Sequence, residues 1–307
     1  MACQGIPYIP SSIASTLADA VFSSVTRVVD FAISENVDTV VIGGNILDPD
    51  RATPSDYGFI HEQMCRLAQS NIPVIWGWSH LDKRNHWPRC IEWPSNIHFL
   101  VGDTPLTIDV DMKSDLTVSY LGMEPTSSAP VRAEDFRGMQ TGHFTLGLAY
   151  GEVAVTDENT DCQHWLLAGE SYGQINWENG VQAYYCGSPL GRSTADLGPH
   201  GFALLELNEK GEVDHQFINT SGVEYHRKTI AASEVESPDA LLALIRQSIR
   251  AHTWDKSILN VVQVEIVDAP VIVEAIPLLN TYLSFHTDVQ SDFDKLGSHL
   301  IFAGLDI

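Results

Sequence analysis

Basic residues are scarce in this sequence. The 307 residues include 17 lysines and arginines against 40 aspartates and glutamates, which gives a formal net charge of −23 at pH 7. Proteins that bind nucleic acids draw much of their affinity from lysine and arginine side chains that neutralise phosphates. The composition therefore disfavours DNA or RNA as a partner, although solubility is an equally good reason for an acidic surface.

Long apolar runs and paired cysteines are also missing. No apolar stretch reaches the roughly 18 residues that a membrane helix needs, and no basic segment followed by an apolar one marks a secretory signal. The five cysteines are scattered and form no Cys-x-x-Cys pair, which is typical of reduced thiols. We therefore expect a cytoplasmic protein without a membrane contact.

Several common catalytic patterns do not occur. The glycine- and serine-rich segment 187–193 lacks the lysine of a phosphate-binding loop, so we interpret it as a turn after a strand. There is no Gly-x-Ser-x-Gly motif. Cys162 and His164 have the wrong spacing and company for a zinc site. These absences turn attention to the ends of the predicted strands.

The first part of the chain alternates helix and strand patterns. Apolar residues recur at helical spacing over 12–35, and a second helix begins at Pro54. Short apolar runs at 37–42 and 72–76 predict buried parallel strands. Open α/β sheets carry their functional residues at the C-terminal ends of such strands.

The rest of the chain is mostly β in pattern. Strand-like segments stand at 97–101, 116–121, 144–150, 165–168, 181–186 and 201–207. Ser237-Pro238-Asp239 predicts the start of a helix that ends near Arg250, and 259–267 predicts a further strand. Because the apolar pattern lapses at 225–236, we expect two domains, 1–230 and 236–307.

A resemblance to a known family rests on collinear motifs. They are the run 27–33, the segment 37–48 with Gly43-Gly44-Asn45, the segment 77–82, Leu146-Gly147-Leu148, the segment 165–169, the segment 185–193 and Gly198-Pro199-His200-Gly201. In this order they resemble calcineurin-like metallophosphoesterases, closest to the SbcD- and YhaO-type DNA-repair exonuclease branch. The resemblance covers roughly residues 13–250. It implies a metallophosphoesterase-like β-sandwich flanked by helices, an α/β fold, with a small α+β capping-like module at the C-terminus.

The same resemblance implies a chemistry that these side chains do not support. Members of the family hold two divalent ions, Mn or Mg, about 3.5–4 Å apart, with carboxylate, amide and imidazole ligands from strand-end loops. The motif positions for ligands carry Asn45, Ser79, Tyr150, Glu170 and Tyr172 in this chain. The first motif would precede Ser11, where only Gln4 and Ile6 could stand for it. We therefore expect no metal and a catalytically degenerate member of the fold.

His80 keeps the position of the family's catalytic histidine. Without metals it has nothing to assist, so we interpret it as an ordinary loop residue and Asn45 as an amide that bonds within its own turn. Glu170 and Tyr172 are expected to fill the former metal cavity as a polar plug, with Tyr150 bonded to Glu170.

Three alternatives stay open. A single-metal site could use His80, His86 and Glu170. A phosphodiesterase or nuclease with altered ligands would draw on the remaining groups near the strand ends, which are Asp48, His80, Asp82 and Glu170. Four tryptophans could instead stack on a planar ligand, although core packing is favoured for Trp76, Trp78, Trp87 and Trp93.

By resemblance, exonuclease subunits of this family form homodimers and dock a coiled-coil ATPase through their C-terminal region. A homodimer or a protein partner of this kind is therefore expected here, for a chain that binds or assembles and does not catalyse.

Overall fold

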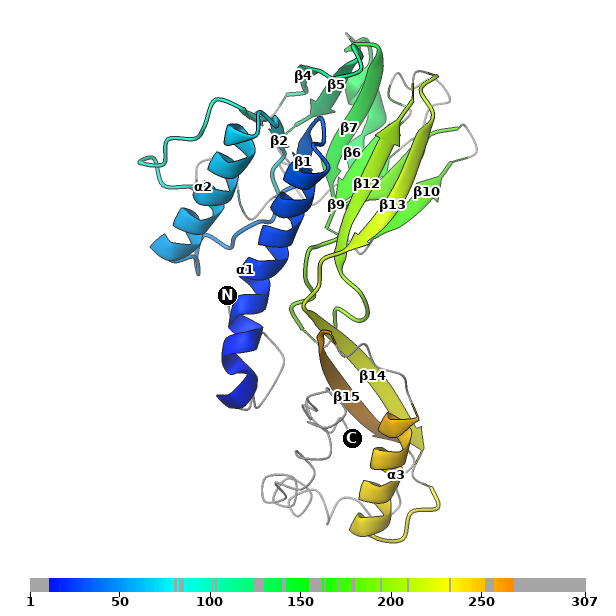
Figure 1. Ribbon diagram of the computed structural model, residues 1–307. Helices are drawn as coiled ribbons and strands as arrows, with labels where there is room; N and C mark the ends of the chain where they lie inside the picture. The colour runs from blue at the N-terminus through cyan, green and yellow to red at the C-terminus, as the bar shows by residue number, and fades with distance from the viewer. Residues whose placement is uncertain are drawn as a thin grey trace. The chain divides into compact units, whose positions relative to one another are not determined.

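The computed structural model describes residues 11–267 except for 80–81, 83–85, 101, 103, 124–129, 140–141, 155–161, 163, 170–171, 178–179, 194, 209, 232 and 252–256 (Figure 1). The chain forms two compact units. The first consists of Val25–Pro189 and His200–Thr220, and the second of Ala2–Ser24, Leu190–Pro199 and Ser221–Ile307. The expected division into 1–230 and 236–307 stays a prediction.

The first sheet of the first unit is parallel and short. Its strands run in the order β1 (Val40–Ile42), β2 (Val74–Trp76) and β3 (Ile97–Phe99). Two helices, α1 (Ser11–Ser34, of which the part from Val25 belongs to this unit) and α2 (Pro54–Gln69), pack on one face of the sheet. Burial of apolar residues from α1, α2 and all three strands into one core stabilises this layer.

Helix α2 begins where the sequence predicts. Thr53 caps it: its hydroxyl accepts from the backbone N–H of Asp56, whose carboxylate accepts from the backbone N–H of Thr53 at 2.7 Å. This reciprocal capping box satisfies backbone donors that a helix start leaves without partners. Pro54 adds a backbone already suited to the first helical turn.

The second sheet of the first unit has six strands in the order β10-β11-β9-β7-β5-β4. The strands are β4 (Leu106–Asp111), β5 (Thr117–Gly122), β7 (Phe144–Tyr150), β9 (His164–Ala168), β10 (Gly173–Asn176) and β11 (Gln182–Tyr185). The four inner strands β11, β9, β7 and β5 are parallel, and both edge strands are antiparallel. This mixed arrangement buries the inner strands, as their nearly continuous apolar sequences predict.

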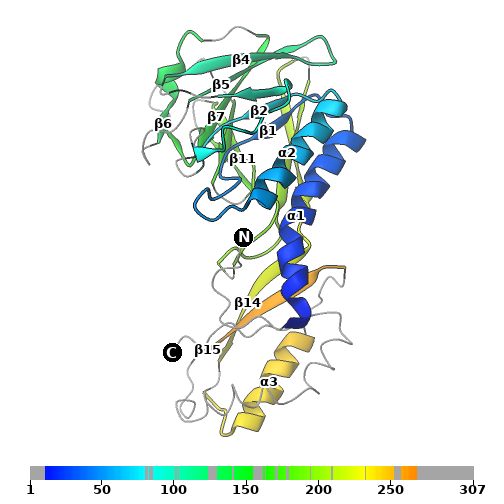
Figure 2. The same ribbon diagram turned by 90° about the vertical axis from the view of Figure 1, so that its left-hand side faces the viewer.

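The two sheets share a core. Ile75 of β2 and Leu100 belong to one buried cluster with Tyr120, Leu146 and Leu166 of the second sheet. The opposite face of the six-stranded sheet packs against a 3₁₀ helix, η2 (Ala133–Phe136), and the small pair β6 (Val131–Arg132) and β8 (Val153–Ala154). The first unit is therefore a β-sandwich with helices on one side, the expected α/β fold class (Figure 2).

The last part of the first unit is a separate hairpin. Among the described strands, β12 (Gly201–Leu207) and β13 (Val213–Asn219) form an antiparallel sheet of their own. Phe202 of β12 meets Phe31 of α1 edge to face at 5.1 Å between ring centroids. Arg27 of α1 donates to the carbonyl oxygen of Thr220, which follows β13, at 3.0 Å.

The second unit contains a parallel pair and a helix. Strand β14 (Val223–Ala231) pairs with β15 (Leu259–Val267), and α3 (Pro238–Arg250) connects them. Its core joins Tyr225 and Val261 of the two strands with Leu17 of α1. Strand β14 occupies much of the segment 225–236, where the apolar pattern lapses in the sequence. Within the part of the chain described above, no helix is long and apolar enough to span a bilayer.

Candidate functional site

The C-terminal ends of four strands meet in the first unit. Gly43, after β1, lies so close to the end of β9 that a Cβ atom there would stand 2.3 Å from the Cβ of Ala168. Gly169, after β9, faces the ring of Tyr150 at the end of β7, and its own missing Cβ would lie 3.3 Å from that ring. The tertiary structure thus brings together loops that lie more than a hundred residues apart in the sequence.

The loop after β1 also packs directly on the loop after β2. Gly44 has φ of +98°, and a Cβ atom at this position would lie 2.5 Å from the backbone nitrogen of Ser79. Only glycine fits there, because both the conformation and the approach exclude a side chain. Asn45 follows with φ of 59°, a left-handed conformation that asparagine tolerates better than most residues.

Asn45 is bonded across the site. Its side-chain nitrogen donates to the phenolic oxygen of Tyr150 at 3.3 Å, a contact between residues 105 apart. The bond of the side-chain nitrogen thus runs to β7, while a bond of Asn45 within its own turn stays a prediction. Two positions that the family resemblance assigns to metal ligands are joined here by a hydrogen bond between neutral groups.

The side chain of Asp82 links the loops after β1 and β2. It is 0% exposed. One carboxylate oxygen accepts from the backbone N–H of Ile46 at 2.9 Å, and the other accepts from the backbone N–H and the hydroxyl of Ser79 at 2.9 and 2.6 Å. Both oxygens are thus engaged by donors from this chain, and Asp82 acts as a structural link between the loops after β1 and β2.

Sequence reasoning counted Asp82 only among the remaining acidic groups and missed this role. A signal was available, because Ser79-x-x-Asp82 has the spacing of reciprocal side-chain-to-backbone bonding seen at capping boxes. The backbone N–H of Asp82 in turn donates to the Ser79 hydroxyl at 3.3 Å, which completes that pattern.

The described ring contacts of Tyr172 are with residues of β13. Its ring packs against Phe217 of β13 at 4.9 Å between centroids and lies 6.1 Å from His215. Burial, and secondarily the nearby carboxylate of Asp214, raise the pKa of the Tyr172 phenol, so it stays neutral at ordinary pH. The polar plug stays a prediction, since Glu170 lies outside the described residues.

The retained histidine, His80, lies outside the described residues, and so does Glu170. The single-metal alternative with His86 therefore also stays a prediction. In the portion of the chain that the structure describes, no three His, Cys, Asp or Glu side chains gather in a way that could hold a metal ion.

The described donors at the strand ends do not suit two divalent cations. They are an amide at Asn45, a hydroxyl at Ser79, a phenol at Tyr150 and a carboxylate at Asp82 whose oxygens already accept hydrogen bonds. Divalent metals in such sites require deprotonated anionic or imidazole ligands. No catalytic step through a metal pair follows from these residues.

The four tryptophans between β2 and β3, or within β2, pack on one another. Trp76, Trp78 and Trp87 are at most 4% exposed and belong to the core between the first sheet and the helices. Trp76 stacks on Trp78 at 5.4 Å between ring centroids and meets Trp87 and Trp93 edge to face at 5.3 and 5.2 Å. The favoured core interpretation agrees with this packing, which leaves those three rings no open face for a planar ligand.

Known proteins give one informative similarity. No protein-family model matches the chain. The chain is 21% identical over 261 residues to a Bacillus subtilis (strain 168) protein named "Uncharacterized metallophosphoesterase YhaO", and the match covers 80% of this chain and 63% of the Bacillus protein. This distant similarity supports a relationship to the metallophosphoesterase superfamily, and the mixed α/β sandwich is consistent with that fold.

Proposed function

We propose that this chain is a catalytically degenerate relative of the DNA-repair metallo-exonucleases, which keeps their scaffold for binding or assembly. The observation that carries the proposal is the hydrogen bond between Asn45 and Tyr150. By resemblance these two positions would supply a bridging carboxylate and an imidazole to the metals. In this chain each serves as the other's partner.

The electrostatics of the site support the same proposal. A bridging carboxylate offsets part of the mutual repulsion of two dications, which an amide cannot do because it carries no charge. Tyr150 replaces an imidazole nitrogen, a strong ligand for divalent metals, by a phenol that is neutral unless deprotonated. Losing both at one site removes far more metal affinity than either substitution alone would.

The packing around the site indicates a scaffold that is still maintained. Asp82 ties the loops after β1 and β2 together through three hydrogen bonds, and Gly43 and Gly44 preserve the close approach of neighbouring strand ends. A surface that had lost every role would tolerate looser packing there. We therefore assign the strand-end region a binding or positioning role.

The alternative is a metal-dependent phosphodiesterase or nuclease with altered ligands. It is favoured by the similarity to the Bacillus protein, which is named a metallophosphoesterase. His80 and Glu170 would have to carry the metal in that case. This alternative makes the opposite prediction for metal binding, so one experiment separates the two.

The proposed partner is another protein in the cytoplasm. We propose a homodimer or a protein partner such as a coiled-coil ATPase, because the family resemblance includes both kinds of assembly. The net charge of −23 argues against free nucleic acid, since an acidic surface repels phosphates.

The test is calorimetric titration of the folded protein with Mn²⁺, beside assays on bis-p-nitrophenyl phosphate and on single-stranded and duplex DNA. We expect neither metal binding nor turnover. The double variant Asn45→Asp/Tyr150→His restores two ligand types at the joined positions and is expected to bind Mn²⁺ more tightly than the parent protein. Asp50→Ala, which removes an exposed carboxylate outside the site, serves as the matched control and should change nothing.

The opposite result is equally specific. Tight Mn²⁺ binding by the unmodified chain, with turnover that disappears in His80→Ala or Glu170→Ala, would establish the rebuilt metal site and end the degenerate interpretation.

A further inference from the structure

A row of aromatic and histidine rings lies between the six-stranded sheet and the β12–β13 hairpin. Phe144 of β7 packs on His164 of β9, with the ring centroids 4.9 Å apart. On its other side His164 lies nearly parallel to Tyr184 of β11, at 6.3 Å and an angle of 9°. Tyr184 in turn meets His215 of β13 at 5.2 Å. The row therefore crosses three neighbouring strands of the sheet and ends on the hairpin.

Both rings that border His164 also contact the hairpin. Tyr184 is fully buried and does so through His215. Phe144 does so through the hairpin turn, because a Cβ atom at Gly211 would stand 3.7 Å from its ring, an ordinary van der Waals separation. His164 thus lies behind the two side chains on which the turn and the first part of β13 rest.

The Nδ1 atom of His164 is buried and has no hydrogen-bond partner among the described residues. A neutral imidazole can carry its proton on Nε2, which leaves only a lone pair at Nδ1. A protonated imidazole has an N–H group on both nitrogens, so the one at Nδ1 would have no acceptor. Because a buried charge without a hydrogen-bonded partner is costly, this position accommodates the neutral ring and disfavours the charged one.

The surroundings of His164 do not offset this cost. Burial raises the pKa of the Tyr184 phenol, which keeps this neighbour uncharged. The described part of the hairpin tip carries the titratable groups Lys210, Glu212, Asp214 and His215. Burial lowers the pKa of His164, and none of the described charged groups contributes to that shift. Aromatic faces attract a cation but accept no proton from Nδ1 along its N–H bond, so they compensate only in part.

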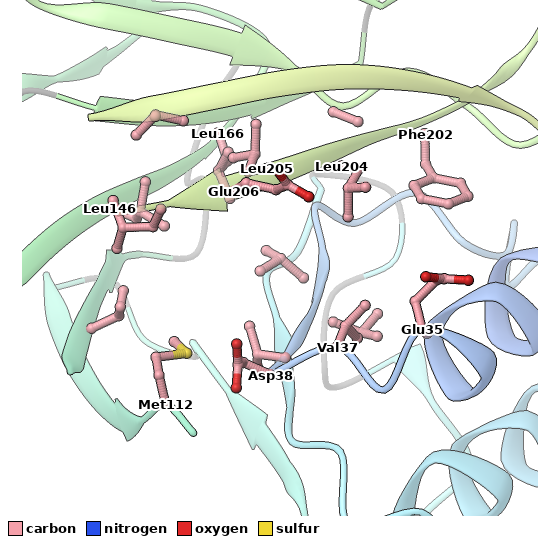
Figure 3. A pocket seen from close by; sticks show the side chains of 18 of the residues that line it. Glu35, Val37, Asp38, Met112, Leu146, Leu166, Phe202, Leu204, Leu205 and Glu206 are labelled. Atoms are coloured by element: carbon pink, nitrogen blue, oxygen red, sulfur yellow. The ribbon is translucent and has the colours of Figure 1, made fainter. Parts of the chain in front are cut away.

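The rest of the hairpin is held by side chains that do not titrate. Leu205 of β12 packs against the core cluster that contains Leu146 of β7 and Leu166 of β9. The same three leucines border one pocket (Figure 3). A change of charge at His164 is therefore expected to act on the hairpin tip and to leave this apolar attachment in place.

We propose that His164 is the sensor of a pH-dependent latch, which holds the hairpin tip around Gly211 and His215 on the sheet at neutral pH and releases it on acidification. The protonated ring is hydrated at Nδ1 only when Phe144 and Tyr184 move away from it. The tip rests on these two side chains and moves with them. Release uncovers their rings at acidic pH.

The direction of the response follows from proton linkage. In the open tip the imidazole is hydrated and titrates near its ordinary pKa of 6.5, whereas burial lowers the pKa in the closed tip. The latch is therefore fully closed above pH 6.5 and weakens as the pH falls through 6.5 toward the pKa of the closed form. For each pKa unit between the two forms, the opening constant can rise by up to about 10-fold.

The test is hydrogen exchange of the full chain, followed by mass spectrometry and corrected for the intrinsic effect of pH. Between about pH 7 and about pH 5, peptides from 205–215 should exchange at least about 3-fold faster, while peptides from β5 keep their rate. His164→Phe retains a ring but cannot be protonated, so it should abolish this response. His98→Phe removes a half-buried histidine from β3 and should leave the response intact.

A second measurement covers the case in which His164→Phe fails to fold. An NMR titration of the imidazole in the unmodified chain should show His164 gaining its proton over the pH range in which the tip loosens. A ring that stays neutral throughout that range would overturn the proposal.

Three exchange results would overturn it as well. One is a tip whose exchange does not respond to acid. Another is a response that persists in His164→Phe, which would place the sensor elsewhere, for example at His215. The third is an equal acceleration in β5, which would indicate unfolding of the whole unit in place of a local release.

Discussion

Asp82 provides the most direct test of how the strand-end loops are held together. Replacing it by alanine removes the acceptor of the Ile46 and Ser79 N–H groups and of the Ser79 hydroxyl. The Ser79 donor is fully buried and would lose about 1–3 kcal/mol, while the half-buried Ile46 donor would lose about 1 kcal/mol because water can reach it. The hydroxyl can rotate to another acceptor and is not counted. We therefore expect Asp82→Ala to lower the free energy of unfolding by about 2–4 kcal/mol.

The assay is urea denaturation followed by circular dichroism, with the slope against denaturant checked for equality between variants. Asp82→Asn keeps one acceptor oxygen but turns an amide toward the other donor, so its expected loss is about 1–3 kcal/mol. Asp50→Ala, on the exposed side of the neighbouring loop, is the control and should stay within about 0.5 kcal/mol of the parent. A loss below about 1 kcal/mol for Asp82→Ala, at unchanged slope, would refute the role assigned to this carboxylate.

Three further predictions concern the same unit. Gly43→Ala should destabilise the protein by about 1–3 kcal/mol, because the new Cβ would stand 2.3 Å from that of Ala168. Gly58→Ala in α2, where a Cβ would meet nothing within 4 Å, should stabilise it by about 0.5–1 kcal/mol. Equal effects of the two variants in urea denaturation would contradict the packing. A double-mutant cycle with Asn45→Gly and Tyr150→Phe should give a coupling of about 0.5–1.5 kcal/mol for their hydrogen bond, and strict additivity would argue against the bond in solution. Burial lowers the pKa of His164 below its ordinary 6.5, so the unfolded chain binds more protons than the folded one and stability should fall as pH drops through 6.5. His164→Phe should flatten that fall when unfolding is measured from about pH 7 to 5, and an unchanged pH profile would exclude His164 as its source.

Periodicity was sufficient for the elements with strong local patterns. The helix expected over 12–35 is α1, Ser11–Ser34, and the strand expected at 259–267 is β15, Leu259–Val267. The start of α2 was predicted at Pro54, because proline suits the first helical turn and is a signal that the sequence alone carries.

Strands stabilised mainly by their partners were missed. The edge strand β10, Gly173–Asn176, is mostly exposed, and β13, Val213–Asn219, alternates only partly. Strand β14, Val223–Ala231, covers much of the segment 225–236 that looked like a boundary, with charged residues in its sequence. Its pairing with β15, more than thirty residues later, stabilises it, and such distant pairing leaves little local signal.

The features of the candidate site also fall into those that the sequence predicts and those that depend on the tertiary fold. The sequence by itself determined which residue types stand at the ends of β1, β2, β7 and β9. Only the tertiary structure decided that Asn45 bonds to Tyr150 and that Asp82 joins the loops after β1 and β2. Side-chain identity is a property of the chain, whereas the partner that satisfies a buried polar group or a strand edge depends on which distant segment the fold brings beside it.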